Sequence, residues 1–234
     1  MPASQDTQPA LEPSAASVSH STIRVWDPFV RFFHWSLVLS FALSYWSVKA
    51  GKIELHTLLG YFLAGLILAR LLWGFYGSRH ARFSDFIHSS AAVLHYLKTI
   101  AAGHPRRFLG HNPAGGLMVA VLLAVLFFIS LTGLIVLAVI DFDGPLLGLT
   151  HAVNDHQAYA VLEAHELAVN VILAMASLHL LGVMLASFQH KENLVRAMIT
   201  GDKETGDETD IPPAVEPEQK DLRIPAYSGV SERN

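Results

Sequence analysis

Residues 164–188 of the chain read AHELAVNVILAMASLHLLGVMLASF and form an almost uncharged apolar stretch. The stretch is long enough to cross the ~30 Å hydrocarbon layer of a membrane as a helix of ~20 residues. Helix is the expected conformation, because a segment in lipid must satisfy its own backbone hydrogen bonds. Histidine inside a membrane is costly unless it has a partner, so His165 and His179 in this stretch indicate a functional site.

The spacing of these two histidines places them on one face of the predicted helix. They are fourteen residues apart, which at about 1.5 Å per residue separates them by roughly 21 Å along the helix axis. A rotation of about 100° per residue returns the second side chain to nearly the direction of the first. One helix therefore presents two imidazoles at two depths.

Three further apolar stretches precede this one, at about residues 29–48, 56–76 and 115–138. Each has about the length of a spanning helix, and the first follows Asp27-Pro28, a capping residue before a proline that suits the first helical turn. The composition is 52% hydrophobic and only 15% charged, which favours lipid over water. The sequence thus predicts an all-α integral membrane protein, a bundle of four spanning helices.

The polar segments predict the orientation of the bundle. The segment between the second and third spans is rich in Arg and Lys, whereas residues 139–163 are acidic and contain neither. By the positive-inside rule the basic segment and both chain ends are cytoplasmic, although Lys49 and Lys52 in the first loop run against this. Residues 84–101 predict a short amphipathic helix on the cytoplasmic membrane surface. Residues 1–22 and 205–234 have the composition of disordered tails, which leaves 23–204 as one membrane domain.

This orientation sorts four histidines of the spans into two pairs. His34 begins the first span and His179 lies near the end of the fourth, so both are at the cytoplasmic level. His56 and His165 begin spans that start at the outer surface. Two imidazoles from different helices are the arrangement that ligates haem iron on both axial sides. The chain has no Cys, so the sequence predicts two non-covalent haems, held by His34/His179 and by His56/His165.

Two more residues share the face of these ligands. Gly60 follows His56 by one turn, and its missing side chain leaves room for a flat macrocycle or for close helix packing. Arg70 is fourteen residues after His56, at the cytoplasmic haem level, where its charge would pair with a haem propionate. Anchoring at the membrane interface is the alternative for Arg70.

The remaining ionisable residues indicate no further site. A net charge of −4 without a basic block gives no reason to expect a nucleic-acid partner. Nine other histidines fall in tails, loops or span edges and are interpreted as solvated: His20, His80, His88, His95, His104, His111, His151, His156 and His190.

A series of motifs runs through residues 23–204 in a fixed order. They are VWDP (25–28), RFFHW (31–35), HTLLGY (56–61), RLLWGF (70–75), His165-Glu166 with His179, and HKENL (190–194). Together they resemble the bacterial cytochrome b561 family, which includes the b-type cytochrome subunit of nickel-iron hydrogenases. The resemblance implies a four-helix protein of the bacterial inner membrane with two b haems, axially held by His34, His56, His165 and His179.

The resemblance also implies a role as the electron-transfer subunit of a respiratory oxidoreductase. Members exchange electrons with quinone and often dock a periplasmic partner, either a hydrogenase-like enzyme or a c-type cytochrome. The direction of electron flow stays open at this point. No motif marks the quinone site, and Glu163, Glu166 and His156 are candidates near the outer haem.

Two other functions fit part of the pattern. A stand-alone superoxide:quinone oxidoreductase would be active without a partner, although the acidic outer loop would repel an anion. A histidine-lined transporter would use the intramembrane histidines as a path and would show no haem spectrum.

Overall fold

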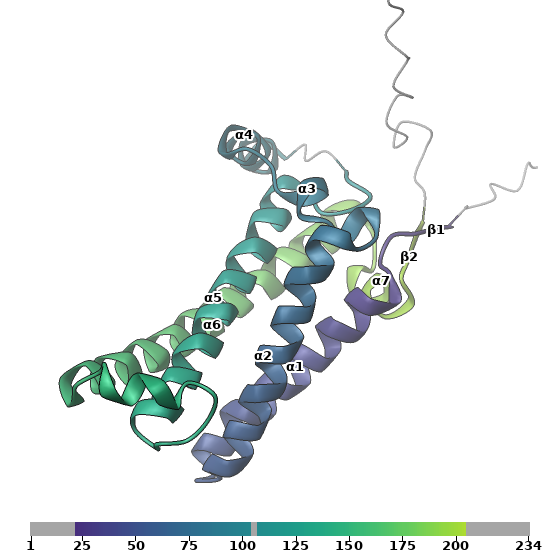
Figure 1. The fold of residues 1–234 in the computed structure, drawn as a ribbon. Helices are drawn as coiled ribbons and strands as arrows, with labels where there is room; N and C mark the ends of the chain where they lie inside the picture. The colour runs from purple at the N-terminus through teal and green to yellow at the C-terminus, as the bar shows by residue number, and fades with distance from the viewer. Residues whose placement is uncertain (1–21, 104–106, 205–234) are drawn as a thin grey trace, which may run out of the picture.

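The computed structural model describes residues 22–103 and 107–204. Figure 1 shows four long helices, which are α1 (Pro28–Lys49), α2 (Ile53–Tyr76), α5 (Pro113–Val139) and α6 (Asp155–His190). Shorter elements join them or follow them: η1 (Arg79–Ala81), α3 (Phe83–Phe86), α4 (Ser90–Ala101), η2 (Leu147–His151) and α7 (Leu194–Thr200). Each of the four apolar stretches in the sequence therefore forms one long helix.

The long helices begin at capping residues. Asp27 accepts a hydrogen bond from the backbone N–H of Val30 at 2.8 Å, which fixes the start of α1. Asn112 caps α5 in the same way, with a proline at the next position. Such caps satisfy backbone donors that have no partner inside the helix.

The start of α6 differs from the prediction. The span was predicted from residue 164, but the helix begins at Asp155, where Asn154 and Gln157 form a reciprocal capping box. The prediction of a loop over residues 139–163 is therefore wrong for its last part. With 36 residues, α6 is about 54 Å long, so it extends beyond a ~30 Å hydrocarbon layer.

The structure also differs from the prediction of one amphipathic helix over residues 84–101. It consists of two pieces, α3 and α4, because Ile87 to Ser89 are not helical. The Ser89 side chain caps the second piece by accepting a hydrogen bond from the N–H of Ala92. A serine cap starts a new helix rather than continuing the old one.

The long helices pack in sequence order. α1 lies against α2, α2 against α5 and α5 against α6, whereas no comparable packing joins α1 to α6 in the described part of the chain. Ile67 of α2, Leu126 of α5 and Ile172 of α6 form a buried apolar cluster near the middle, and partly buried side chains of α1 pack on it. The four helices thus share one core.

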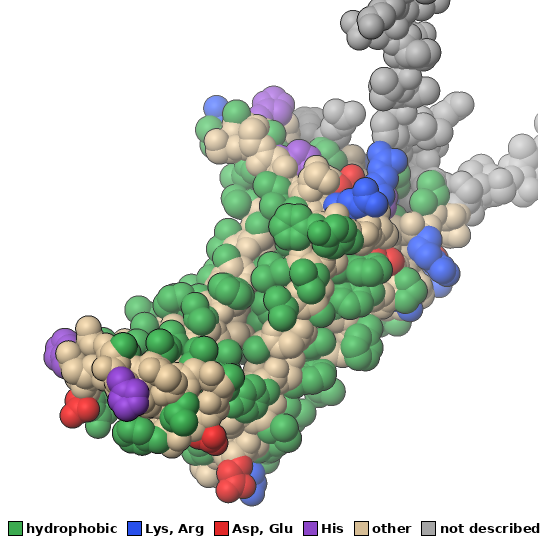
Figure 2. Space-filling view, in the orientation of Figure 1, with side chains coloured by type: hydrophobic (Ala, Val, Ile, Leu, Met, Phe, Trp, Pro, Cys, Tyr) green, Lys and Arg blue, Asp and Glu red, His purple; other side chains and the backbone are tan. Residues whose placement is uncertain are grey.

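The outer surface of the long helices is apolar. Figure 2 shows hydrophobic side chains along their length, with Lys and Arg gathered at the end that carries α3 and α7. Leu58 of α2 is 65% exposed and Leu181 of α6 is 62% exposed. Within the described residues, α2, α5 and α6 are long and apolar enough to cross a membrane. Such a surface belongs in lipid, so the chain is a mostly helical membrane protein.

A small sheet departs from the all-α prediction. β1 (Thr22–Arg24) pairs antiparallel with β2 (Asp202–Glu204), so the segment before α1 and the segment after α7 lie side by side. Thr22 is therefore in a strand and not in a tail. The rest of the predicted disordered tails, 1–21 and 205–234, lies outside the described residues.

Candidate functional site

His56 of α2 and His165 of α6 face each other. Their ring centroids are 6.2 Å apart and their planes are at 89°. The Nδ1 atom of His56 lies 3.2 Å from the carbonyl oxygen of Ser44, and that of His165 lies 3.1 Å from the carbonyl oxygen of Ile129. A carbonyl oxygen only accepts hydrogen bonds, so in both rings the hydrogen is on Nδ1 and the lone pair is on Nε2.

This geometry fits a metal ion between the two rings. Metal–imidazole bonds are about 2 Å long, and a ring nitrogen lies roughly 1 Å from its centroid, so two axial imidazoles have centroids about 6 Å apart. The observed separation is 6.2 Å. Donation from Nδ1 to a carbonyl oxygen also orients a metal-binding imidazole and raises its basicity. The pair thus suits the two axial positions of a haem iron.

Two glycines shape the surroundings of this pair. A Cβ atom at Gly133 of α5 would lie 3.1 Å from Cε1 of His165, so any other residue there would require the ring to shift by a few tenths of an ångström. A Cβ atom at Gly60 would meet no other heavy atom within 4 Å. Close helix packing therefore does not explain Gly60.

His34 of α1 and His179 of α6 lie toward the opposite end of the helices. The charge of His179 acts on His34, so the two imidazoles lie within electrostatic reach of each other. The Nδ1 atom of His34 is buried and has no hydrogen-bond partner among the described residues. The His34 ring packs edge-on against Trp35, with centroids 5.1 Å apart.

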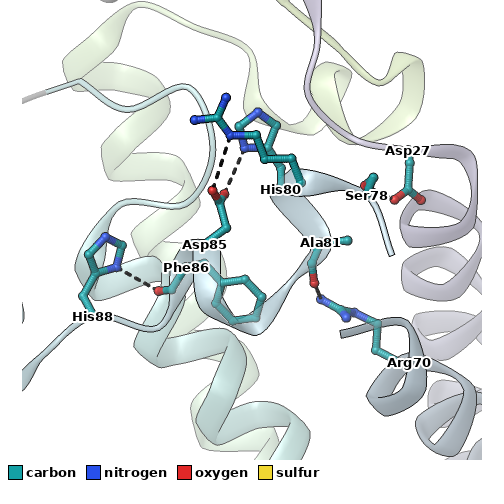
Figure 3. A network of polar contacts seen from close by, with 9 residues as sticks. Asp27, Arg70, Ser78, His80, Ala81, Asp85, Phe86 and His88 are labelled. Carbon is teal, nitrogen blue, oxygen red and sulfur yellow. Dashed lines mark hydrogen bonds and ion pairs between the residues drawn. The ribbon is translucent and has the colours of Figure 1, made fainter. Parts of the chain in front are cut away.

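Arg70 is buried at the same end, with 3% of its surface exposed. Figure 3 shows its guanidinium directed at the carbonyl oxygen of Ala81, to which Nη2 donates at 3.1 Å. The guanidinium also lies over the rings of Phe83 and Phe86. Its Nη1 atom is buried and has no partner within the described part of the chain. A buried cation with an unused donor fits an anionic group such as a haem propionate better than an exposed interface anchor.

His111 is a half-buried residue with a buried ring nitrogen, which the sequence did not reveal. It lies just before α5, with its ring centroid 4.7 Å from Trp26 and 5.1 Å from Phe86, and its Nδ1 atom is buried without a partner in the described residues. Burial, with added repulsion from nearby positive charges, lowers the pKa of His111 to about 3. The interpretation of His111 as solvated is therefore wrong.

Other histidines of this end also have protein partners. Nδ1 of His80 lies 3.0 Å from the Asp85 carboxylate, and Nδ1 of His88 donates to the carbonyl oxygen of Phe86 at 2.9 Å (Figure 3). The interpretation of these two histidines as solvated is therefore incomplete, because both imidazoles contact protein groups. His20 and His104 lie outside the described residues.

Asp27 joins the first two long helices beside Arg70. Its carboxylate accepts hydrogen bonds from the indole N–H of Trp73 at 3.0 Å and from the hydroxyl of Ser78. Burial alone would raise the pKa of Asp27, but these hydrogen bonds and that of Val30 outweigh it and hold the pKa below its usual value. The ionised carboxylate thereby fixes the start of α1, which positions His34 two turns later.

The predicted quinone candidates all lie on one helix. Glu163, Glu166 and His156 are all exposed on α6. Glu166 interacts electrostatically with His165, which places its charge near the outer pair.

Comparison with known proteins agrees with the geometry of the site. A family model described as prokaryotic cytochrome b561 matches residues 25–201. A probable Ni/Fe-hydrogenase B-type cytochrome subunit from Bradyrhizobium diazoefficiens is 25% identical, over 82% of this chain and 90% of the relative. A protein of the same description from Rhizobium leguminosarum bv. viciae is 22% identical, over 80% and 91%. No solved structure matches the chain significantly.

The family model spans all four long helices and both histidine pairs. Proteins of this kind bind b haem, and the residues at the His56/His165 site have the tautomers and the separation that such a group needs. The chain therefore belongs to the prokaryotic cytochrome b561 family and is a membrane b-type cytochrome that serves electron transfer.

Proposed function

We propose that this chain is a dihaem cytochrome of the bacterial inner membrane that passes electrons between the quinone pool and a periplasmic redox partner. The observation that carries the proposal is the facing pair of His56 and His165, whose centroids are 6.2 Å apart and whose Nδ1–H groups both donate to carbonyl oxygens. Both rings are thereby held with a lone pair on Nε2, ready for iron.

The second haem is assigned to His34 and His179. The buried Nη1 of Arg70 would hold a propionate of this inner haem, since a buried guanidinium needs an anion. Gly60 would leave room for the outer macrocycle, because nothing lies within 4 Å of the position of a Cβ atom there. Each haem would thus bridge α6 and one of the first two helices.

In this proposal α1 is the fourth spanning helix, within a membrane domain of residues 23–204. Its four serines lower its mean hydropathy, but three of them, Ser40, Ser44 and Ser47, are buried. The opposite face presents large apolar side chains, with Leu39 62% exposed. A helix with its polar stripe turned inward presents an apolar surface to lipid.

The orientation follows from charge. The ends of the described chain pair in the sheet of β1 and β2, so both emerge at the end where Lys and Arg gather (Figure 2). We assign this end, with both termini, to the cytoplasm by the positive-inside rule. The His56/His165 pair is then near the periplasm.

The chemistry divides between cofactor and protein. When bound, a haem held by two imidazoles would supply reversible one-electron transfer rather than bond chemistry on a substrate. The protein fixes the imidazole tautomers through carbonyl oxygens, keeps the ligands at two depths on one rigid helix, and surrounds them with apolar side chains that exclude water. This division favours a path for electrons over bond chemistry inside the bundle.

The partners are proposed from the relatives and the exposed surface. Both relatives are described as subunits of a Ni/Fe-hydrogenase, so a periplasmic hydrogenase-like enzyme is the first partner to test, and a c-type cytochrome the second. Quinone is the expected exchangeable substrate in the membrane. A superoxide assay of the purified chain alone would identify activity without a partner.

The test is a haem count combined with ligand replacement. The purified chain should contain two b haems, and His165→Ala and His179→Ala should each remove one and leave the other. His156→Ala is the matched control, because this exposed histidine of α6 belongs to neither pair. A colourless wild-type protein, or two haems retained in either ligand variant, would overturn the proposal.

A further inference from the structure

The outer pair and His34 of the inner pair differ in the hydrogen bonding of their Nδ1 atoms. At the outer pair, hydroxyl groups add to the carbonyl acceptors: Ser44 Oγ lies 3.0 Å from Nδ1 of His56, and Thr132 Oγ1 lies 3.1 Å from Nδ1 of His165. At the inner pair, Nδ1 of His34 is buried and has no partner within residues 22–103 and 107–204. The surroundings of the two pairs are therefore unequal.

The hydrogen bonds of Thr132 define its role. Its hydroxyl donates to the carbonyl oxygens of Phe128 at 2.9 Å and Ile129 at 3.1 Å, one turn back in α5. A hydroxyl carries one hydrogen and two lone pairs, so toward His165 it accepts. The Nδ1–H of His165 is thus shared between two acceptors, Thr132 Oγ1 and the carbonyl oxygen of Ile129.

Charged groups lie at both levels, but they do not by themselves rank the two sites, because the ionised Asp27 beside Arg70 offsets positive charge at the inner end. Glu166 acts on His165 at the outer pair. Arg70 is buried at the end of the helices that holds the inner pair. Its charge acts on His111, and so does the charge of His179. A nearby negative charge favours an oxidised iron, whereas a nearby positive charge favours a reduced one.

We infer that Ser44 and Thr132 are positioning residues that lower the reduction potential of the outer haem below that of the inner one. Acceptors at Nδ1 make an imidazole a stronger donor to iron and so stabilise the oxidised state. This inference rests on the proposed dihaem function. With both haems bound, one electron would pass from the His56/His165 site to the His34/His179 site; the first iron would be oxidised and the second reduced, and no bond would form or break and no proton would move.

The consequence is a direction for electron flow. An electron supplied by a periplasmic reductant at the outer site moves to the inner site with a favourable free energy change. The inner site then delivers the electron to an acceptor near the cytoplasmic end. Transfer from the inner site back to the outer site has an unfavourable free energy change. The unequal hydrogen bonding thus favours electron transfer from the outer site toward the basic end of the bundle.

The experiment measures the potentials of the full-length protein with its haems bound. Ser44→Ala and Thr132→Val remove one acceptor each but leave the carbonyl oxygens of Ser44 and Ile129 in place. In an optical redox titration, each variant should raise the midpoint potential of the lower-potential haem and leave the other unchanged. Ser40→Ala and Thr99→Val are controls, because these hydroxyls bond only to carbonyls of their own helices. Thr132→Ser keeps the hydroxyl and should behave as wild type.

A ligand variant identifies which step belongs to the outer haem. His165→Ala should abolish the lower-potential step; loss of the higher-potential step instead would overturn the inference. Unchanged potentials in both hydroxyl variants would also overturn it while leaving two haems and the proposed function intact. Fewer than two haems in the wild type would mean failure of the proposed function itself. If Thr132→Val lost its haem, Ser44→Ala would decide the outcome on its own.

Discussion

Burial of His111 predicts a specific loss of stability in acid. The pKa of this imidazole is about 3 in the folded protein against an ordinary value of 6.5. The main cause is burial, and the positive charges that face it add to the effect: Arg70, His179, His80 and Lys203. Between those two pH values the unfolded chain binds one more proton than the folded protein, so stability falls as pH drops below about 6.5.

The size of the loss follows from the pKa window. One pKa unit corresponds to 1.36 kcal/mol, so the interval from about 6.5 down to pH 5 removes about 2 kcal/mol. His111→Gln cannot take up a proton and should lack this part of the pH dependence. The free energy of unfolding of both proteins is measured by denaturant titration in detergent from pH 7.5 to pH 5. Over this range the wild type should lose about 2 kcal/mol more than His111→Gln.

A second variant controls for the other histidines. His95 is exposed on α4, so His95→Gln should follow the pH dependence of the wild type. The histidines inside the bundle are the same in all three proteins, so their contributions cancel in the comparison. Parallel curves for wild type and His111→Gln would refute the account of His111 as a buried neutral imidazole.

Two further predictions concern the basic end of the bundle. Gly116→Ala should lower the unfolding midpoint markedly, because its Cβ atom would overlap the carbonyl oxygen of Phe86, whereas Gly65→Ala, with no atom within 4 Å, should not. Arg107→Gln should reduce the free energy of unfolding by about 1–2 kcal/mol, because it leaves the partly buried Glu192 carboxylate with one ion-pair partner fewer. Thermal unfolding of each purified variant in detergent, compared with wild type, measures both effects.

Much of the helical layout could be predicted from the sequence because its signals are local. The apolar runs are as long as the helices that they form, and the caps at Asp27 and Asn112 stand directly before prolines. The capping box of α6 is equally local. It lies in the acidic segment before the apolar run, and that segment was interpreted as a loop. The strand pairing of β1 and β2 joins two segments of three residues, which are too short to show an alternating pattern.

The histidine pairs were predictable for a different reason. Helical geometry fixes the depth of every residue in a span once its ends are known, so His56 and His165 were expected at one level. Their partners Ser44 and Thr132 were not, because each lies on another helix and only the rotation of α1 and α5 brings it to the ring. His111 escaped notice likewise, since Trp26 and Phe86, which cover it, come from distant segments.

The serines of α1 lower the mean hydropathy of this helix, yet one of them serves the proposed haem site. Ser40, Ser44 and Ser47 recur at helical spacing and are buried, so one stripe of the helix is polar. A helix that packs only against other apolar helices gains nothing from such a stripe, because each hydroxyl must find a hydrogen-bond partner in a dry interior. The Ser44 hydroxyl finds one in His56, whose Nδ1–H it accepts. The polarity that makes α1 the least obvious membrane helix is therefore what a helix needs beside a histidine that must be held in one tautomer.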